Sequence, residues 1–441
     1  MKVTLIPVYF DPGRDENFDK NLNIAKDLLK EEVEFTSPLP LGSDLPDADG
    51  VIFPQMLGEA YRNIEKLKAI TLPILIITSD AGTVNMWDWE LVHYLKLNGI
   101  QPICPTSLED TRLVCRALLI KRLMAQSKFV VYQDDPAGPS GQQSDIFKRF
   151  YWLEKESSRS IFDTYGITIE QRSFKKLVQN ASQIPDDEAQ GIINRWKSKG
   201  KSHISERALL SAIKLYMVLK KEYLKDEAIL AMGLNCLNES KSCDTTPCLA
   251  WNLLYAEEKL IWGCEADTMT MLTEIFADKI LQVPFFMTNL YPFIMGKAAL
   301  SHERIPHFPE VDEPDNHILA AHCGYFGLVP ETFADTWKLK KKVLAIVNEN
   351  AHMLDATLPT GKVTLVKFQP YLKKVSISEA ELTGYVQYEN SDCLNGGIIK
   401  VRDGRNFVDN VVSHHYIVMD GHQIAAMKLI ANIFNYELDV I

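Results

Sequence analysis

The sequence predicts an α/β protein in which two parallel-sheet domains precede a small antiparallel β-barrel. Over most of the chain, short apolar runs alternate with helical segments, which is typical of βαβ units. From about residue 357 the pattern changes to short strands separated by turn signals, which indicates a barrel. A chain of 441 residues is also too long for one ordinary core. We therefore expect Rossmann-like domains at residues 1–126 and 127–282 and a C-terminal domain at residues 283–441.

The first domain is expected to alternate strands and helices in chain order. Its predicted elements are a strand at residues 2–10, a helix at 21–32, strands at 49–55, 72–79 and 101–105, and a helix at 111–125. Parallel strands need crossover connections, and these helices supply them. No GxGxxG or GxxxxGK[ST] pattern follows the first strand, so neither nucleotide-binding fingerprint is present.

The rest of the chain changes from alternating elements to strands alone. The predicted elements are strands at 128–135 and 227–237, helices at 205–224 and from 269, strands at 283–289, 317–324, 361–368, 374–389, 396–402 and 412–421, and a helix at 423–434. Ser205 directly precedes the long helix and is a suitable N-cap. The last four strands follow one another without a predicted helix between them, so we expect them to pair in an antiparallel barrel.

Composition excludes several classes of partner. Hydrophobic content of 46% and charged content of 24% describe a soluble globular protein. A net charge of −11 argues against a nucleic-acid partner and against an anionic membrane surface. No apolar run approaches the roughly 20 residues that span a bilayer, and no signal-peptide pattern opens the chain, so we expect a cytoplasmic protein. The eight cysteines form no CxxC pair, and we expect them to be reduced.

Two carboxylates, Glu265 and Asp267, stand where an apolar strand turns into a helix. From Met269 onward, apolar residues recur at helical spacing. An acidic residue at a helix start is usually a cap, and this is the expected role of Asp267. Glu265 lies before the helix, at the carboxyl end of a strand, where open α/β sheets bind their ligands. It is therefore the stronger candidate for a functional residue.

Three histidines accompany this carboxylate as candidate metal ligands. His322 ends a predicted strand, and His414 and His415 adjoin the last strand of the barrel. A lone buried histidine is more often a core residue than a ligand. One carboxylate and two imidazoles together, however, suit a divalent transition metal with open coordination positions.

Four segments in this order resemble the L-fucose isomerase and L-arabinose isomerase superfamily. "PCLAWNLLYAEEKLIWGCEADTMTMLT" is similar to the family's Cys-Glu-x-Asp segment, and "ILAAHCG" to its strand that ends in a metal-site histidine. "SHHYIVMDGH" resembles its last histidine segment, and "GKVTL" with "AELTGY" resembles its barrel. The resemblance covers most of the chain and is strongest from about Asn235 onward. It implies two α/β domains followed by a C-terminal domain with a small barrel.

The resemblance also implies a ligand set. Glu265 matches the family's first carboxylate, a metal ligand and proton-transfer group. His415 matches its C-terminal ligand, and His414 is the alternative if the register slips by one. His322 matches the strand-end histidine of the arabinose branch. The family's second carboxylate is expected 24 residues after Glu265 (289 minus 265), where this chain has Asn289. An amide can bind a metal or a hydroxyl but cannot take up a proton near neutral pH, so the usual pair of carboxylates is incomplete.

A metal-dependent aldose–ketose isomerase is the function that the resemblance implies, with Mn²⁺ as the expected ion and an enediol intermediate. Glu265 is the expected base and Asn289 a candidate partner. Asp312, Glu313 or Asp315, or a metal-bound water, is the alternative acid. Other possibilities are an epimerase or modified-sugar isomerase of the same fold, an inactive sugar- or metal-binding protein, and a structural subunit of an oligomer.

The sugar itself is expected to contact residues from several segments. Trp87, Trp89 and Gln55 follow strands of the first domain, and tryptophan rings often stack on sugars, although core packing is the alternative. Asn235 ends the strand at 227–237, and His414 adjoins His415; both are predicted substrate contacts. In the family that this chain resembles, the first domain can contribute to a neighbouring subunit's site, which implies a homo-oligomer, a trimer or hexamer.

Overall fold

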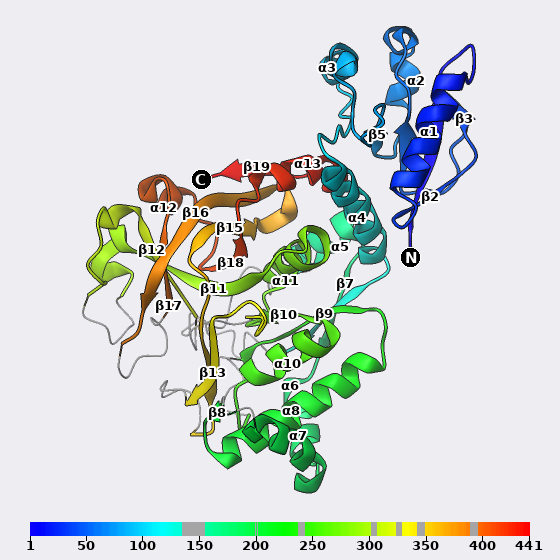
Figure 1. Cartoon of the computed structure of the whole chain (residues 1–441). Coiled ribbons are helices and arrows are strands. Elements are labelled where there is room, and N and C mark those ends of the chain that lie inside the picture. Colours follow the sequence, from blue (N-terminus) through cyan, green and yellow to red (C-terminus); the bar gives the residue numbers. More distant parts are fainter. Residues whose placement is uncertain are drawn as a thin grey trace. The chain divides into compact units, whose positions relative to one another are not determined.

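The structure, a computed structural model, consists of two compact units (Figure 1). It describes residues 1–134, 155–198, 200, 202–236, 243–300, 307–322, 329–341, 349–388 and 396–441. Unit 1 comprises Met1–Ala125, Lys279–Leu281 and Ala425–Glu437, and unit 2 comprises Gln126–Asp278, Gln282–Ile424 and Leu438–Ile441. The predicted division into three domains stays a prediction.

Unit 1 contains the first parallel sheet, as predicted. Its elements are β1 (Val3–Tyr9), α1 (Glu16–Leu28), β2 (Val33–Phe35), β3 (Leu39–Pro40), β4 (Gly50–Phe53), α2 (Ile64–Lys68), β5 (Ile74–Ile76), α3 (Trp89–Leu97), α4 (Leu108–Met124) and α13 (Ile424–Phe434). The strands pair in parallel in the order β2-β1-β4-β5, and β3 also pairs with β1. The predicted strand at 101–105 is reduced to a single bridge between Ile103 and Leu75.

Unit 2 contains a second parallel sheet. Its elements before the barrel are β6 (Lys128–Tyr132), α5 (Lys155–Tyr165), β7 (Thr168–Arg172), α6 (Phe174–Ser182), α7 (Asp186–Ser198), β8 (Ser202–His203), α8 (Glu206–Leu224), β9 (Ile229–Leu234), α10 (Cys248–Glu258), β10 (Ile261–Cys264) and α11 (Thr268–Ile275). The sheet order is β10-β9-β6-β7, all parallel. Trp262 of β10 and Leu219 of α8 belong to the core that covers this sheet.

The barrel is closed and antiparallel, as the sequence predicts. The remaining elements are β11 (Phe285–Pro292), β12 (His317–Ala321), β13 (Thr336–Lys341), β14 (His352–Thr357), β15 (Gly361–Phe368), β16 (Lys374–Val386), β17 (Gly396–Lys400), α12 (Gly404–Asn410), β18 (His415–Asp420) and β19 (Glu437–Val440). Six strands form the ring in the order β15-β18-β11-β12-β17-β16, which β15 and β16 close. Two of the six, β11 and β12, precede the predicted start at about residue 357. The fully buried run of β12 has no alternation to indicate an antiparallel partner.

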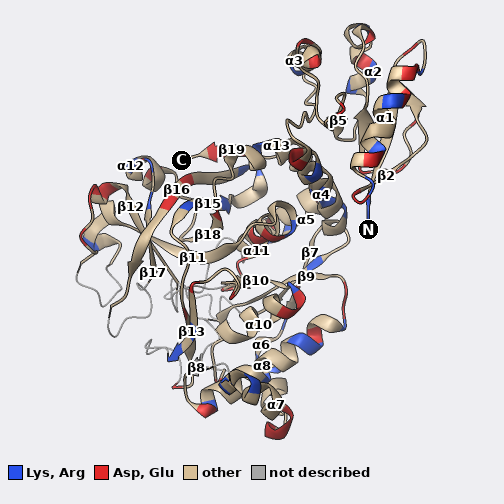
Figure 2. Ribbon diagram, in the orientation of Figure 1, with Lys and Arg blue, Asp and Glu red and all other residues tan. Residues whose placement is uncertain are grey.

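Helix starts in unit 2 follow local capping rules. The Ser205 side chain accepts from the Ala208 N–H, which confirms the predicted cap of α8. Asp267 likewise accepts from the Thr270 N–H at the start of α11. Helix α7 begins with acidic residues and ends with basic ones, which complements its macrodipole (Figure 2). Within the parts of the chain that the structure describes, no helix has the length and apolarity needed to cross a membrane.

Two glycines allow α11 to lie directly on the parallel sheet. A Cβ on Gly263 of β10 would lie 2.8 Å from the Asp267 carbonyl oxygen and from two atoms of Met271. A Cβ on Gly233 of β9 would overlap Met271 Cε. Both positions therefore set how closely the start of α11 approaches the strand ends that precede it.

We predict that Gly263→Ala lowers the free energy of unfolding by about 1–3 kcal/mol, because α11 must move away from β10. Gly191→Ala is the matched control. A Cβ there meets nothing within 4 Å, and the residue lies inside α7, where alanine favours the helix. Urea denaturation of both variants measures the difference, and equal stabilities would contradict the close packing of α11.

Candidate metal centre

Glu265 is held in an unusual backbone conformation between β10 and α11. Glu265 and Ala266 both have positive φ, 53° and 56°, although neither is glycine. The Ala266 N–H donates to the Leu234 carbonyl of β9, and the Asp267 N–H donates to the Cys264 carbonyl. Such conformations cost about 1–3 kcal/mol each and persist where the surroundings enforce them, most often at functional sites. The turn thus fixes a carboxylate, only 3% exposed, at the carboxyl end of the sheet.

Two histidines from β18 and the residue before it meet this carboxylate. His415 Nε2 lies 3.6 Å from Glu265 Oε2, and His414 Nε2 lies 3.9 Å from the same oxygen. One donor atom from each of the three residues lies within 4.8 Å of the others. The expected proximity of Glu265 and His415 is therefore observed, and His414 joins them.

This Glu-His-His group, in which Glu265 and His415 are buried, can hold a metal ion. Two ligands that each bind at about 2.1 Å lie at most about 4.2 Å apart, and both measured Glu–His distances are shorter. Two imidazoles and a carboxylate suit Zn²⁺, Mn²⁺ or a related divalent ion and leave positions open for other ligands. The His414 side chain is 40% exposed, so the group is accessible from one side.

A fully buried ion pair orients His415. His415 Nδ1–H donates to Asp267 Oδ2 at 2.9 Å, which directs the Nε2 lone pair toward Glu265. Lys367 of β15 donates to the same Asp267 oxygen at 2.6 Å and to the Thr270 hydroxyl at 2.6 Å. Asp267, Lys367 and His415 are all 0% exposed. Asp267 is therefore a helix cap, as predicted, and also holds His415, one of the three residues that could bind a metal ion.

Burial and neighbouring charges shift the pKa values of Asp267, Lys367 and His415. Burial alone raises the pKa of Asp267, but the Lys367 ammonium and the hydrogen bond from His415 outweigh it and bring the pKa well below its usual value. Burial lowers the pKa of Lys367 despite Asp267. Burial also lowers the pKa of His415, more than the Asp267 hydrogen bond raises it. The arrangement is an ionised carboxylate beside a neutral imidazole.

Asn289 and His322 lie beside the three-residue group. Asn289 of β11 is the Cα partner of His415 in the β11–β18 ladder, so their side chains lie on the same face of the barrel. The His322 ring centroid is 5.7 Å from that of His415. His322 does not belong to the group of Glu265, His414 and His415, and metal binding by Asn289 and His322 stays a prediction. Asn235, 1% exposed, directly follows β9.

The alternative acids lie at the wrong end of β12. Asp312, Glu313 and Asp315 precede this strand, whereas His322 follows it. A strand of five residues separates the two ends by roughly 17 Å. Glu313 is exposed and pairs with Lys400. The expectation that one of these residues replaces the missing carboxylate is therefore wrong.

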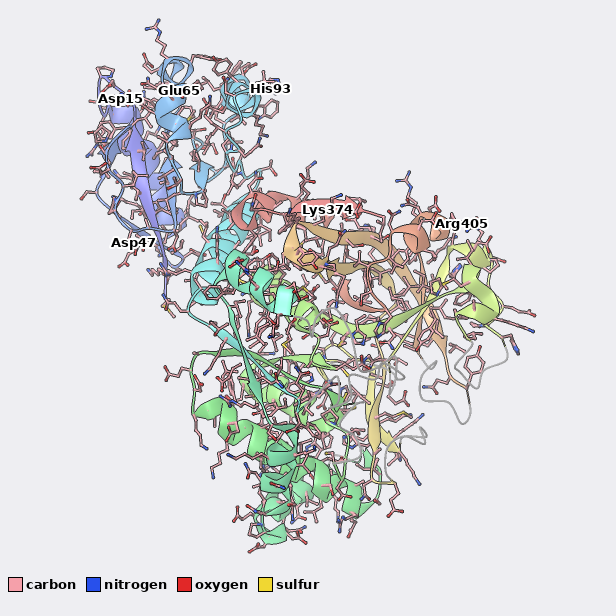
Figure 3. All side chains as sticks on the ribbon, turned by 180° about the vertical axis from the view of Figure 1, so that it is seen from behind. Asp15, Asp47, Glu65, His93, Lys374 and Arg405 are labelled. Atoms are coloured by element: carbon pink, nitrogen blue, oxygen red, sulfur yellow. The ribbon has the colours of Figure 1, made fainter. Side chains whose placement is uncertain are left out.

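The predicted sugar contacts of the first domain belong to unit 1. Gln55 donates to Asp15, which Figure 3 labels, at 3.1 Å. Trp87 and Trp89 are 77% and 61% exposed, so the alternative of core packing is wrong for both indoles. Their role, and that of Gln55, in binding a sugar stays a prediction.

Asp267→Asn is expected to weaken binding of a divalent metal about 10- to 100-fold, because the amide no longer holds the His415 tautomer and leaves Lys367 without its counter-charge. Titration calorimetry with MnCl₂ measures the effect. Asp403→Asn is the matched control, because Asp403 also caps a helix, α12, through the Asn406 N–H. Equal losses in both variants would show that Asp267 acts only as a cap.

Comparisons with known proteins add no family to this geometry. A scan of protein-family models found no match, and a search of curated proteins found none either. The site is therefore defined by its own residues: a carboxylate on a strained turn, two adjacent histidines, and a buried ion pair behind one of them. What this group does follows from its chemistry.

Proposed function

We propose that this protein is a metal-dependent aldose–ketose isomerase that uses Mn²⁺ or a similar ion. The observation that carries the proposal is the group of Glu265, His414 and His415, whose donor atoms lie within 4.8 Å of one another at the carboxyl end of a parallel sheet. Ligands of α/β proteins bind at this edge. The resemblance of the surrounding segments to sugar isomerases supports the same assignment.

The three side chains would hold the ion and leave room for two substrate oxygens. A divalent metal bound there supplies a Lewis acid that polarises the carbonyl group of the sugar. His415 keeps its orientation through Asp267, and His414 lies on the accessible side. The side chains of the protein would bind the sugar chain, orient C1 and C2, and transfer one proton between these two carbons.

Glu265 is the proposed base. In the aldose-to-ketose direction, its carboxylate takes the proton from C2, which leaves an enediol, and returns the proton to C1. The hydroxyl at C2 loses its proton and the carbonyl oxygen at C1 gains one, so the sugar is isomerised without net loss of atoms.

Asn289 favours a second candidate function. Asn289 is the Cα partner of His415, and in the family that the chain resembles a second carboxylate at this position would assist the proton transfers between oxygens. An amide donates and accepts hydrogen bonds but does not take up a proton. An epimerase or an isomerase of a modified sugar, in which a neutral group holds a hydroxyl, is therefore the alternative. Either enzyme is proposed as a cytoplasmic homo-oligomer, a trimer or hexamer.

The direct test is exchange of the proton at C2 in D₂O. We expect Mn²⁺-loaded protein to incorporate deuterium into at least one aldose of a panel and to form the matching ketose. Glu265→Gln should lose about 10²- to 10⁴-fold of the exchange rate at saturating metal, because the amide cannot act as a base. Glu313→Gln, which removes an exposed carboxylate paired with Lys400, is the control. No exchange with any aldose by the unmodified protein would refute the isomerase.

Replacing Asn289 with aspartate separates the two candidate functions. An isomerase that tolerates the amide should gain turnover of ordinary aldoses, because a proton acceptor is restored beside the metal. An enzyme that needs a neutral group should lose its activity, because a second negative charge raises the proton affinity of the carboxylate pair. Turnover and metal content are measured from pH 5 to 9, and unchanged values for both would place Asn289 outside the site.

A further inference from the structure

The carboxyl edge of the parallel sheet in unit 2 continues beyond Glu265 as a row of polar residues. Cys264, Leu234 and Tyr132 are aligned Cα partners at the ends of β10, β9 and β6. The next residues along these strands are Glu265, Asn235 and Gln133.

Backbone hydrogen bonds extend this alignment by one residue. The Asn235 N–H donates to the Tyr132 carbonyl at 3.1 Å, and the Gln133 N–H donates to the Arg172 carbonyl of β7 at 3.0 Å. Neighbouring strands lie about 4.8 Å apart, so Gln133 lies about 10 Å from Glu265 along the sheet edge, with Asn235 between them. The row therefore runs away from the metal centre along the sheet edge.

Gln133 is a buried amide whose oxygen has nothing to bind in the part of the chain that the structure describes. The residue is 7% exposed, and its Oε1 is buried without a hydrogen-bond partner among those residues. Its backbone carbonyl accepts from Gln171 Nε2 at 2.9 Å, which fixes the main chain. Burying an amide oxygen without a donor is unfavourable, so a donor from a ligand would stabilise this position.

We propose that Gln133 binds a distal hydroxyl of the sugar, beyond the carbons that react. This inference rests on the proposed function, because Glu265 at one end of the row defines where C1 and C2 lie. Asn235 faces the middle of the substrate, and Gln133 its far end. Only a substrate with several carbons beyond C2 reaches from the metal ligands to Gln133, so this residue selects for chain length.

The residues of this row also indicate the charge of the far end of the substrate. Asn235 and Gln133 are neutral amides, which bind hydroxyls through donor and acceptor atoms. Arg172, on the adjacent strand, is already held by Glu170 at 2.7 Å and Glu222 at 3.2 Å. A phosphate is usually bound by cations or by a cluster of N–H donors. Among the described residues of this row there is neither such a cation nor such a cluster, so the row fits an unphosphorylated sugar.

Binding of alditols tests the proposal without the need for turnover. Calorimetry on the Mn²⁺-loaded full chain compares erythritol, with four carbons, with galactitol and glucitol, with six. We expect the better of the two hexitols to bind more tightly than the tetritol, and Gln133→Met to reduce that gain roughly tenfold while leaving Mn²⁺ affinity and tetritol binding unchanged. Gln190→Met, which removes an exposed amide bonded to Asn194 on α7, should keep the full gain.

The possible results separate this inference from the isomerase itself. The same preference for hexitols in the unmodified protein and in Gln133→Met would overturn the role of Gln133. Tighter binding of glucitol 6-phosphate than of glucitol would overturn the neutral end. The protein could prefer hexitols through Gln133 and yet exchange no aldose proton. That result would support the binding row and refute the isomerase.

Discussion

One fully buried carboxylate, Asp267, joins the parts of unit 2 that form the candidate metal centre. It caps α11 through Thr270, holds His415 of β18, and accepts the Lys367 ammonium from β15. An ion pair in this interior is stable only while both partners and their hydrogen bonds are present, because each charge alone would be costly to bury. The orientation of His415 therefore depends on how the barrel packs against α11.

Local signals made much of the fold predictable. The strand predicted at 361–368 is β15 residue for residue, and Ser205 caps α8 as expected. The role of Asp267 as a cap also agrees with the sequence, whereas the proximity of Glu265 to His415 was expected only from the resemblance to sugar isomerases. Capping residues and alternating or continuous apolar runs act within a few positions of the chain, so one sequence reveals them.

Features that depend on distant pairing were not predictable. Lysine in a strand usually lies on a solvated face, yet Lys367 is fully buried in an ion pair with Asp267. Asp267 lies 100 residues earlier in the chain, so no local pattern indicates this pair. The barrel closes through β11 and β12, whose apolar runs equally fit a parallel sheet. His414 was expected to contact substrate. Its approach to Glu265 depends on the place where β18 begins, directly after His414. The exposure of the Trp87 side chain likewise depends on the tertiary packing of unit 1.

The distance in sequence between the two halves of the centre has a consequence for folding. Asp267 and His415 are 148 residues apart, and β11 meets β18 across a similar separation. Contacts of this kind form late, after much of the chain has lost its freedom, so the donors converge only in the folded state. An ion that binds this state alone stabilises it by mass action, by about 2.7 kcal/mol at 100 times its dissociation constant. The supply of such an ion would then help to set the fraction of chains that is folded.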